Sequence, residues 1–173
     1  MKIYRMHRAV RAAADYSGAM QAGGRWNPIG TPMLYTAQHL SLACPEILVH
    51  LDKSELPRDY VWSQTDLPRN PERLHFDDLN HVSSCQGPGH SWVRTAGELA
   101  VQVPSVVIPA ESNFLLKRTP GIFNACLGRA APVSIRSPAL LIRALDFVEA
   151  GSPFSSATSG WCNVRSTSFS SGG

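Results

Sequence analysis

A glycine- and proline-rich segment at residues 22–36, AGGRWNPIGTPMLYT, constrains the fold more than any other part of the chain. Its glycines tolerate backbone conformations that other residues avoid, while its prolines fix φ and lack an N–H donor. Both residue types are also the poorest helix formers. The segment therefore predicts an ordered loop that carries Arg25 and then leads into a short strand.

The bulk composition is that of one globular domain, with 43% hydrophobic and 17% charged side chains over 173 residues. No run of about 18 apolar residues exists, so no membrane span is expected. Residues 1–18 lack the apolar stretch of about 7–15 residues that a secretory signal needs, so we expect a cytoplasmic protein. The net charge of +3 is mild, and only HRAVR at residues 7–11 concentrates basic side chains. A dedicated nucleic-acid surface is therefore not indicated.

Several common kinds of site have no support in the sequence. The histidines show neither HxxxH nor HExxH spacing, so no metal site is expected. The motifs GxSxG, GxGxxG and GxxxxGK[ST] are absent, which removes the usual signals for an α/β-hydrolase, a dinucleotide fold and a P-loop. Four scattered cysteines form no CxxC pair, and we expect them to be buried free thiols: Cys44, Cys85, Cys126 and Cys162.

An alternating pattern at residues 2–6 and short β-favouring runs elsewhere predict strands in four segments. Apolar residues at helical spacing over 39–52 predict a helix, and helix-favouring residues predict helices in several other segments. The expected strands are residues 2–6, 32–37, 59–64 and 99–109, the last broken at Pro104, which favours an edge or a bulge. The expected helices are residues 39–52 with Ser41 as N-cap, 90–99 and 138–148, with shorter helical patches at 9–14 and 71–79. Residues 16–30 are expected to be loop.

Glu46 and Arg25 are the most informative polar residues. Glu46 lies within an apolar helical stretch, where an ionised carboxylate is expensive to bury without partners. It therefore either faces solvent or has a function. The planar guanidinium of Arg25 suits a bidentate contact with phosphate or carboxylate. The alternative is a structural arginine that ties the loop to backbone carbonyls.

The other candidates are ambiguous when taken singly. Tyr35 in the expected strand is either a core residue with a satisfied hydroxyl or a ligand contact. Ser105, at the break in VQVPSVVIP, is either a bulge residue capping its own backbone or a site residue. Asn113 leaves the same choice open, and Arg5 in the first strand would need an anion if it faced the core.

Together these segments resemble a known family. IYRM, GGRWNPIGTPMLYTA, PEILVHL, GHSW and VPSVVIPAESNFLL follow the order and spacing of RES-domain proteins over residues 3–116. These are the toxins of bacterial Xre–RES toxin–antitoxin pairs. The resemblance implies an α+β fold, with a compact mixed sheet and flanking helices similar to the ADP-ribosyltransferase toxins.

The resemblance also implies an activity and partners. NAD would be the substrate, with no further cofactor, and its nicotinamide–ribose bond would be cleaved by hydrolysis or phosphorolysis. The alternatives are transfer of ADP-ribose to a specific protein, or an inactive domain that only binds its antitoxin. A cognate Xre-type antitoxin would be the protein partner and the sole route to nucleic acid, and association of the chain with a second copy of itself is left open.

Residue by residue, the resemblance assigns catalytic roles to Arg25, Glu46 and Ser105. Arg25 would hold the NAD diphosphate, and Glu46 would stabilise positive charge on the ribose and orient the acceptor. Ser105 would hydrogen-bond the nicotinamide amide or the ribose. The substrate-binding set also includes Arg5, Tyr35 and Asn113, with Tyr35 packing against a ring.

The chain departs from the family at two places. Pro45 directly precedes Glu46 inside the expected helix, where it removes one backbone hydrogen bond. After Leu116 the family's usual Asn-Pro-x-His-Pro-like turn and final FDxRL-like strand are missing. We assign residues 1–150 to the RES domain and residues 151–173 to a Ser/Gly-rich disordered tail.

Overall fold

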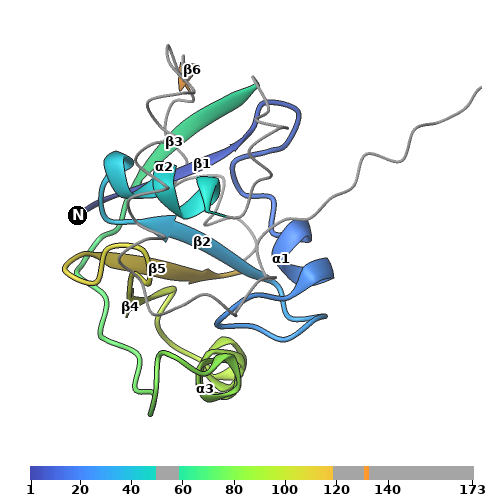
Figure 1. Ribbon diagram of the computed structural model, residues 1–173, viewed down its shortest axis with the longest axis vertical. Coiled ribbons are helices and arrows are strands. Elements are labelled where there is room, and N and C mark those ends of the chain that lie inside the picture. Colours follow the sequence, from blue (N-terminus) through green and yellow to red (C-terminus); the bar gives the residue numbers. More distant parts are fainter. Residues whose placement is uncertain (50–58, 119–130, 133–173) are drawn as a thin grey trace, which may run out of the picture.

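A computed structural model describes residues 1–49 and 59–118, together with a short strand at residues 131–132 (Figure 1). The elements, in chain order, are β1 (Lys2–Arg8), α1 (Ser17–Ala22), β2 (Met33–Ala37), α2 (Leu40–Leu48), β3 (Tyr60–Asp66), α3 (Val82–Arg94), β4 (Ala100–Pro104), β5 (Ser112–Lys117) and β6 (Ala131–Pro132). The strands form one sheet in the order β4-β5-β2-β1-β3-β6, and the fold is α+β as expected.

All pairs of named strands are antiparallel. Within the described part of the chain, the parallel contact is an isolated bridge between Arg73 and Gln102. The sheet is therefore antiparallel throughout its named strands, where a mixed sheet was expected. A parallel pair of neighbouring strands needs a crossover connection, usually a helix. Among the described residues, no helix connects two strands that are neighbours in the sheet and run parallel.

The two central strands touch over a short length. β1 and β2 have one registered pair, Tyr4 with Ala37, whereas β1 pairs with β3 along the whole of Lys2–Arg8. On its other side, β2 pairs with β5 along the whole of Met33–Ala37. The sheet thus consists of two well-paired parts that meet at Tyr4 and Ala37.

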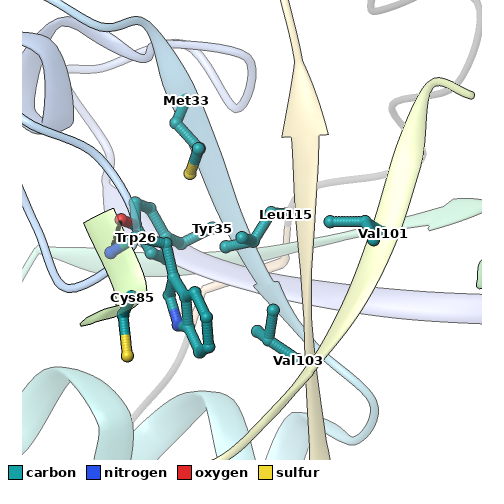
Figure 2. Close-up of a cluster of buried hydrophobic side chains, with 7 residues drawn as sticks. All are labelled: Trp26, Met33, Tyr35, Cys85, Val101, Val103 and Leu115. Atoms are coloured by element: carbon teal, nitrogen blue, oxygen red, sulfur yellow. Dashed lines mark hydrogen bonds between the residues drawn. The ribbon is translucent and has the colours of Figure 1, made fainter. Parts of the chain in front are cut away.

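Both faces of the sheet are covered by apolar contacts. On the face that includes Ala37, Leu42 and Ala43 of α2 form a cluster with Met6. Cys85 of α3 belongs to a second cluster on this face, whose other members are Trp26, Met33, Tyr35, Val101, Val103 and Leu115 (Figure 2). On the other face a third cluster packs beneath Ala14 and Tyr16; its members are Ile3, Leu34, Leu67, Ala100, Phe114 and Leu116. This alternation along β2 and β5 explains why their side chains are all buried.

Most expected strands are confirmed, and Pro104 ends β4, which is the edge strand of the named sheet. The second half of the segment 99–109 is not a strand, because Ser105 leaves the ladder and turns the chain. The expected helix at residues 71–79 is wrong. Gln102 exchanges backbone hydrogen bonds with Glu72 and Leu74, which holds that segment extended along the outer side of β4.

The helices differ more from what the sequence predicts than the strands do. Residues 9–14 form turns, and the helix lies instead at α1, where Gly23 ends it with φ of 73°. Ser41 is not the N-cap of α2, since His39 occupies that position without a side-chain cap. α3 begins eight residues before the expected start at residue 90 and continues through Pro88.

Some expectations lie outside the described residues. These are the helix at 138–148, the boundary at residue 150, the tail at 151–173, and two of the cysteines, Cys126 and Cys162. Cys44 and Cys85 are free thiols, as expected, and Cys85 is buried.

Candidate active site

Glu46 is a buried carboxylate held by two donors on one oxygen. It lies on α2 with 8% of its surface exposed, which decides between the two alternatives for its environment. Its Oε1 accepts a hydrogen bond of 2.6 Å from Ser105 Oγ and one of 2.5 Å from Asn113 Nδ2. Within the described residues, Oε2 accepts no hydrogen bond. The two hydrogen bonds that the described residues make to this carboxylate therefore fix one oxygen and leave the other without a hydrogen bond from them.

Ser105 uses its whole hydrogen-bonding capacity within the protein. Its hydroxyl donates to Glu46 and accepts from the backbone N–H groups of Val107 and Ile108, at 3.1 and 2.9 Å. A serine hydroxyl has one proton and two acceptor sites. Both roles considered for Ser105 are thus present together, since it caps its own turn and also binds the candidate catalytic carboxylate.

Asn113 reaches Glu46 from the sheet beneath α2. It lies on β5 between Val103 on β4 and Ala37 on β2, and it points to the face that α2 covers. Ala37 is small and is followed in the row by Tyr4 on β1. The short side chain at this position leaves α2 close enough to the sheet for the Asn113–Glu46 contact.

The electrostatics of Glu46 result from opposing effects. Burial raises the pKa of Glu46 above its usual value, because the charged form loses contact with water. The hydrogen bonds from Ser105 and Asn113 and the positive charge of Arg25 act in the opposite direction. Such a carboxylate combines a basic oxygen with a fixed orientation, which suits it to acid–base or electrostatic work.

Arg25 is brought to this region by the loop that precedes β2. Gly24 N donates to Asn27 O at 2.8 Å, so residues 24–27 form a turn with Arg25 and Trp26 at its centre. Arg25 Nη1 donates to Leu79 O at 2.6 Å, which is the structural role considered for it. Its charge also lowers the pKa of Glu46, Tyr35 and Cys85 against the effect of burial. Arg25 therefore lies within electrostatic range of Glu46 while anchored by one nitrogen.

Tyr35 supports this loop from within the core. Its hydroxyl donates to Asn27 Oδ1 at 2.5 Å and accepts from Trp26 N–H at 3.2 Å, and burial raises its pKa. Asn27 is fully buried and donates in turn to Ala19 O and Thr31 O. Figure 2 shows the Tyr35 ring beside Trp26 among apolar side chains. These contacts make Tyr35 the internal support of the Arg25 loop.

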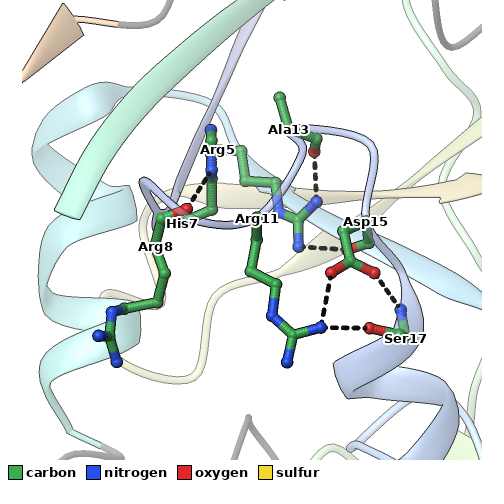
Figure 3. Close-up of polar contacts among 7 residues, drawn as sticks. All are labelled: Arg5, His7, Arg8, Arg11, Ala13, Asp15 and Ser17. Carbon is green, nitrogen blue, oxygen red and sulfur yellow. Dashed lines mark hydrogen bonds and ion pairs between the residues drawn. The ribbon is translucent and has the colours of Figure 1, made fainter. Parts of the chain in front are cut away.

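Arg5 takes part in a different set of contacts (Figure 3). Its guanidinium donates to Ala13 O and to Asp15 O, the latter at 2.7 Å. Asp15 accepts from the backbone of Ser17 and pairs with Arg11. Successive strand residues point to opposite faces, so Arg5 points away from the face that carries Tyr4 and Asn113. Its charge also helps to lower the pKa of Asp15, so a carboxylate lies in the electrostatic range of Arg5 on this face.

The structure thus brings Glu46, Ser105 and Asn113 into direct contact, with Arg25 nearby and Tyr35 behind the Arg25 loop. It directs Arg5 elsewhere. Residue patterns alone missed Gln86 and Asn27, whose contacts join segments that are far apart in the sequence.

Among the described residues no group of three or more His, Cys, Asp or Glu side chains could hold a metal ion. None of the helices described is long and apolar enough to cross a membrane.

Comparison with known proteins places this chain in a family. The family model described as "RES domain" matches residues 2–135. A protein named "Toxin Res" from Photorhabdus laumondii subsp. laumondii is 34% identical over 126 residues, covering 67% of this chain and 81% of that protein. A "Toxin Res" from Yersinia enterocolitica is 30% identical over 146 residues, covering 78% of this chain and 95% of that protein.

Two further matches concern activity and fold. A "Prs ADP-ribosylating toxin" from a Sphingobium species is 29% identical over 113 residues, covering 58% of this chain and 69% of that protein. The crystal structure of the M. tuberculosis MbcT–MbcA toxin–antitoxin complex is similar, with a TM-score of 0.57 at 20% identity. That match covers 82% of this chain and 87% of the other and supports a common fold.

Proposed function

The chain belongs to the RES-domain family, and on that premise we propose that it is the toxin of a toxin–antitoxin pair and acts by breaking the nicotinamide–ribose bond of NAD. The single observation that carries the proposal is the buried carboxylate of Glu46, with Oε1 fixed by Ser105 and Asn113. The family's toxins supply the biological setting.

The chemistry follows from what that carboxylate can stabilise. The bond between the ribose carbon and the nicotinamide nitrogen breaks, its electron pair leaves with nicotinamide, and positive charge develops on the ribose. Glycoside hydrolysis passes through a similar oxocarbenium-like state that carboxylates stabilise. Oε2 of Glu46 would face this charge and orient the acceptor. With water as acceptor, the products are ADP-ribose, nicotinamide and one proton.

Arg25 would bind the diphosphate of NAD. One of its guanidinium nitrogens is held by Leu79 O, so the planar group is already oriented before a ligand arrives. A group fixed in advance loses less entropy on binding than a free side chain does. Arginine also suits phosphate because its donors match two oxygens at once.

Ser105 and Asn113 would act on Glu46 and not on the substrate. The Ser105 hydroxyl has no unused hydrogen-bonding capacity with which to hold the nicotinamide amide or the ribose. Its role is instead to favour one orientation of the carboxylate and to lower the pKa that burial raises.

The protein partner would be an antitoxin that prevents this activity. The similar fold of a toxin solved with its antitoxin, together with the relatives named as toxins, supports such a partner. Nucleic acid would be reached only through that partner.

A second candidate activity is transfer of ADP-ribose to a protein. It is favoured by the Sphingobium relative, whose name describes an ADP-ribosylating toxin. The two reactions share the bond that breaks and differ in the acceptor, so the same Glu46 geometry serves both.

The test uses the purified chain and NAD labelled in the adenine ring. Cleavage predicts free nicotinamide together with free ADP-ribose, or with its phosphate ester when inorganic phosphate is the acceptor. Transfer predicts label that precipitates with added cell protein. Release of nicotinamide by the wild type but not by Glu46→Gln would support the proposal, whereas intact NAD in the presence of folded wild type would refute both activities.

A further inference from the structure

We infer that Gln86 is a positioning residue that sets the place of Arg25, acting through the turn at residues 24–27. This inference rests on the proposed role of Arg25 in binding NAD. Gln86 lies on α3, far from Arg25 in the sequence.

The contact is directed at both ends of that turn. Gln86 Nε2 donates to Gly24 O at 2.8 Å and to Asn27 O at 3.3 Å, so one amide group binds the carbonyls on either side of Arg25 and Trp26. The turn is also closed internally by the hydrogen bond from Gly24 N to Asn27 O. Loss of the Gln86 amide would leave the turn formed but no longer tied to α3.

Two neighbours of Gln86 contact the same loop. His90 Nδ1 and Thr31 Oγ1 share a hydrogen bond of 2.8 Å, and Gly89 lies directly against Trp26 O, where a Cβ atom would come within 1.9 Å. Gln86, Gly89 and His90 are spaced three and four residues apart, so they share one face of α3. This face of α3 therefore packs against the loop, and Gln86 makes the polar contact of this face that lies nearest to Arg25.

The segment just before α3 completes the arrangement. Leu79 O accepts from Arg25 Nη1, and Cys85 Sγ lies 3.5 Å from Asp78 O in the same turn. Gln86 thus holds the backbone at Arg25 through the turn, and Leu79 O holds the guanidinium at the end of the Arg25 side chain. Both supports belong to one continuous stretch of chain, residues 79–86.

A double-mutant cycle tests this. Gln86→Leu keeps the bulk of the side chain and removes its donors, and Gly87→Ala is the matched control, because nothing lies within 4 Å of a Cβ at Gly87. A displaced Arg25 should lower kcat/KM for NAD by about 10- to 100-fold, mostly through KM. In an Arg25→Ala background the same Gln86→Leu change should have almost no effect. With nicotinamide riboside, which lacks the diphosphate, Gln86→Leu should equal the wild type.

The outcomes separate the inference from the proposed function. An active wild type, with equal losses from Gln86→Leu in both backgrounds, would overturn the inference and leave the proposed function standing. A folded wild type that does not consume NAD would overturn both. Backbone amide exchange provides a readout independent of activity: Gln86→Leu should speed exchange at residues 24–27 and leave β1 and β3 unchanged, and unchanged exchange at 24–27 would also overturn the inference.

Discussion

Ser105 and Glu46 are 59 residues apart in the sequence and are joined by a hydrogen bond of 2.6 Å in the interior of the protein. The serine is fully buried, and its hydroxyl can donate only once. The carboxylate therefore receives the serine's one proton, and the turn at residues 105–108 and helix α2 are tied together at the point where the chemistry is proposed to occur.

Replacing Glu46 with Gln should strongly reduce activity and stabilise the fold. Because burial raises the pKa of Glu46, the folded state holds the proton more tightly than the unfolded state does. Stability therefore falls as pH rises from the usual glutamate pKa through the raised one. Gln carries no charge and keeps an oxygen for Ser105 and Asn113. We expect kcat to fall about 10²- to 10⁴-fold and Tm at pH 7.5 to rise, by about 2–4 °C for each kcal/mol.

The stability gain should disappear below the usual pKa of glutamate, where Glu46 is protonated in both states. Thermal unfolding of the two proteins at pH 7.5 and pH 4 measures this. A Glu46→Gln protein that is less stable than the wild type at pH 7.5 would contradict the burial argument.

Replacing Ser105 with Ala should move the pH dependence of activity. The Ser105 hydrogen bond lowers the pKa of Glu46, so its loss should raise that pKa further and shift the acidic limb of the kcat/KM profile to higher pH. The N–H groups of Val107 and Ile108 also lose their acceptor, at a cost of about 1–3 kcal/mol. Ser41→Ala, at an exposed position on α2, is the control. An unmoved limb would indicate that Ser105 does not act through Glu46.

Replacing Tyr35 with Phe should cost stability in the Arg25 loop. The change leaves Asn27 Oδ1 and Trp26 N–H without their partner in a buried region, at about 1–3 kcal/mol for each unsatisfied group. Urea unfolding measures the loss. Tyr16→Phe serves as the comparison, since its half-buried ring packs at the edge of another core cluster. If Tyr35→Phe unfolds at the same urea concentration as the wild type, the hydroxyl does not support the loop.

Gly87 and Gly89, on either side of Pro88 in α3, should respond very differently to alanine. At Gly89 a Cβ would meet Trp26 O at 1.9 Å, so Gly89→Ala must push the helix and the loop apart. At Gly87 nothing beyond its chain neighbours and the helix's own backbone lies within 4 Å, and the helix propensity that alanine gains is opposed by Pro88, which disfavours a helical residue with a Cβ before it. We expect a clearly lower Tm for Gly89→Ala and a Tm close to that of the wild type for Gly87→Ala. Equal shifts in either direction would refute the close packing of α3 on the loop.

The strands could be predicted because their patterns are local. β1 forms where the sequence alternates at residues 2–6, and β2 forms in the short run at residues 32–37, whose strand residues are buried on both faces of the sheet. The segment 71–79 shows the limit of such patterns. Helical turns were expected there, but the backbone of Gln102 in β4, which is distant in the sequence, binds Glu72 and Leu74 instead.

The candidate site was only partly predictable for the same reason. Glu46 could be singled out because a carboxylate within an apolar helical stretch needs an explanation. That Ser105 and Asn113 share its Oε1 depends on the register of β4 and β5, which no local pattern contains. The short α1 and the early start of α3 were missed because glycines and Pro88 weaken their helical signal while tertiary contacts stabilise them.

The long sequence distances within the site have a consequence for the timing of synthesis. The contacts of Glu46 with Ser105 and Asn113, and of Arg25 with Leu79, span 59, 67 and 54 residues. A chain that leaves the ribosome N-terminus first, at about 5–20 residues per second, holds Arg25 and Glu46 for several seconds before β5 exists. The contacts that fix Glu46 and Arg25 therefore form late in synthesis, and the candidate site is incomplete on the growing polypeptide until β5 has been made.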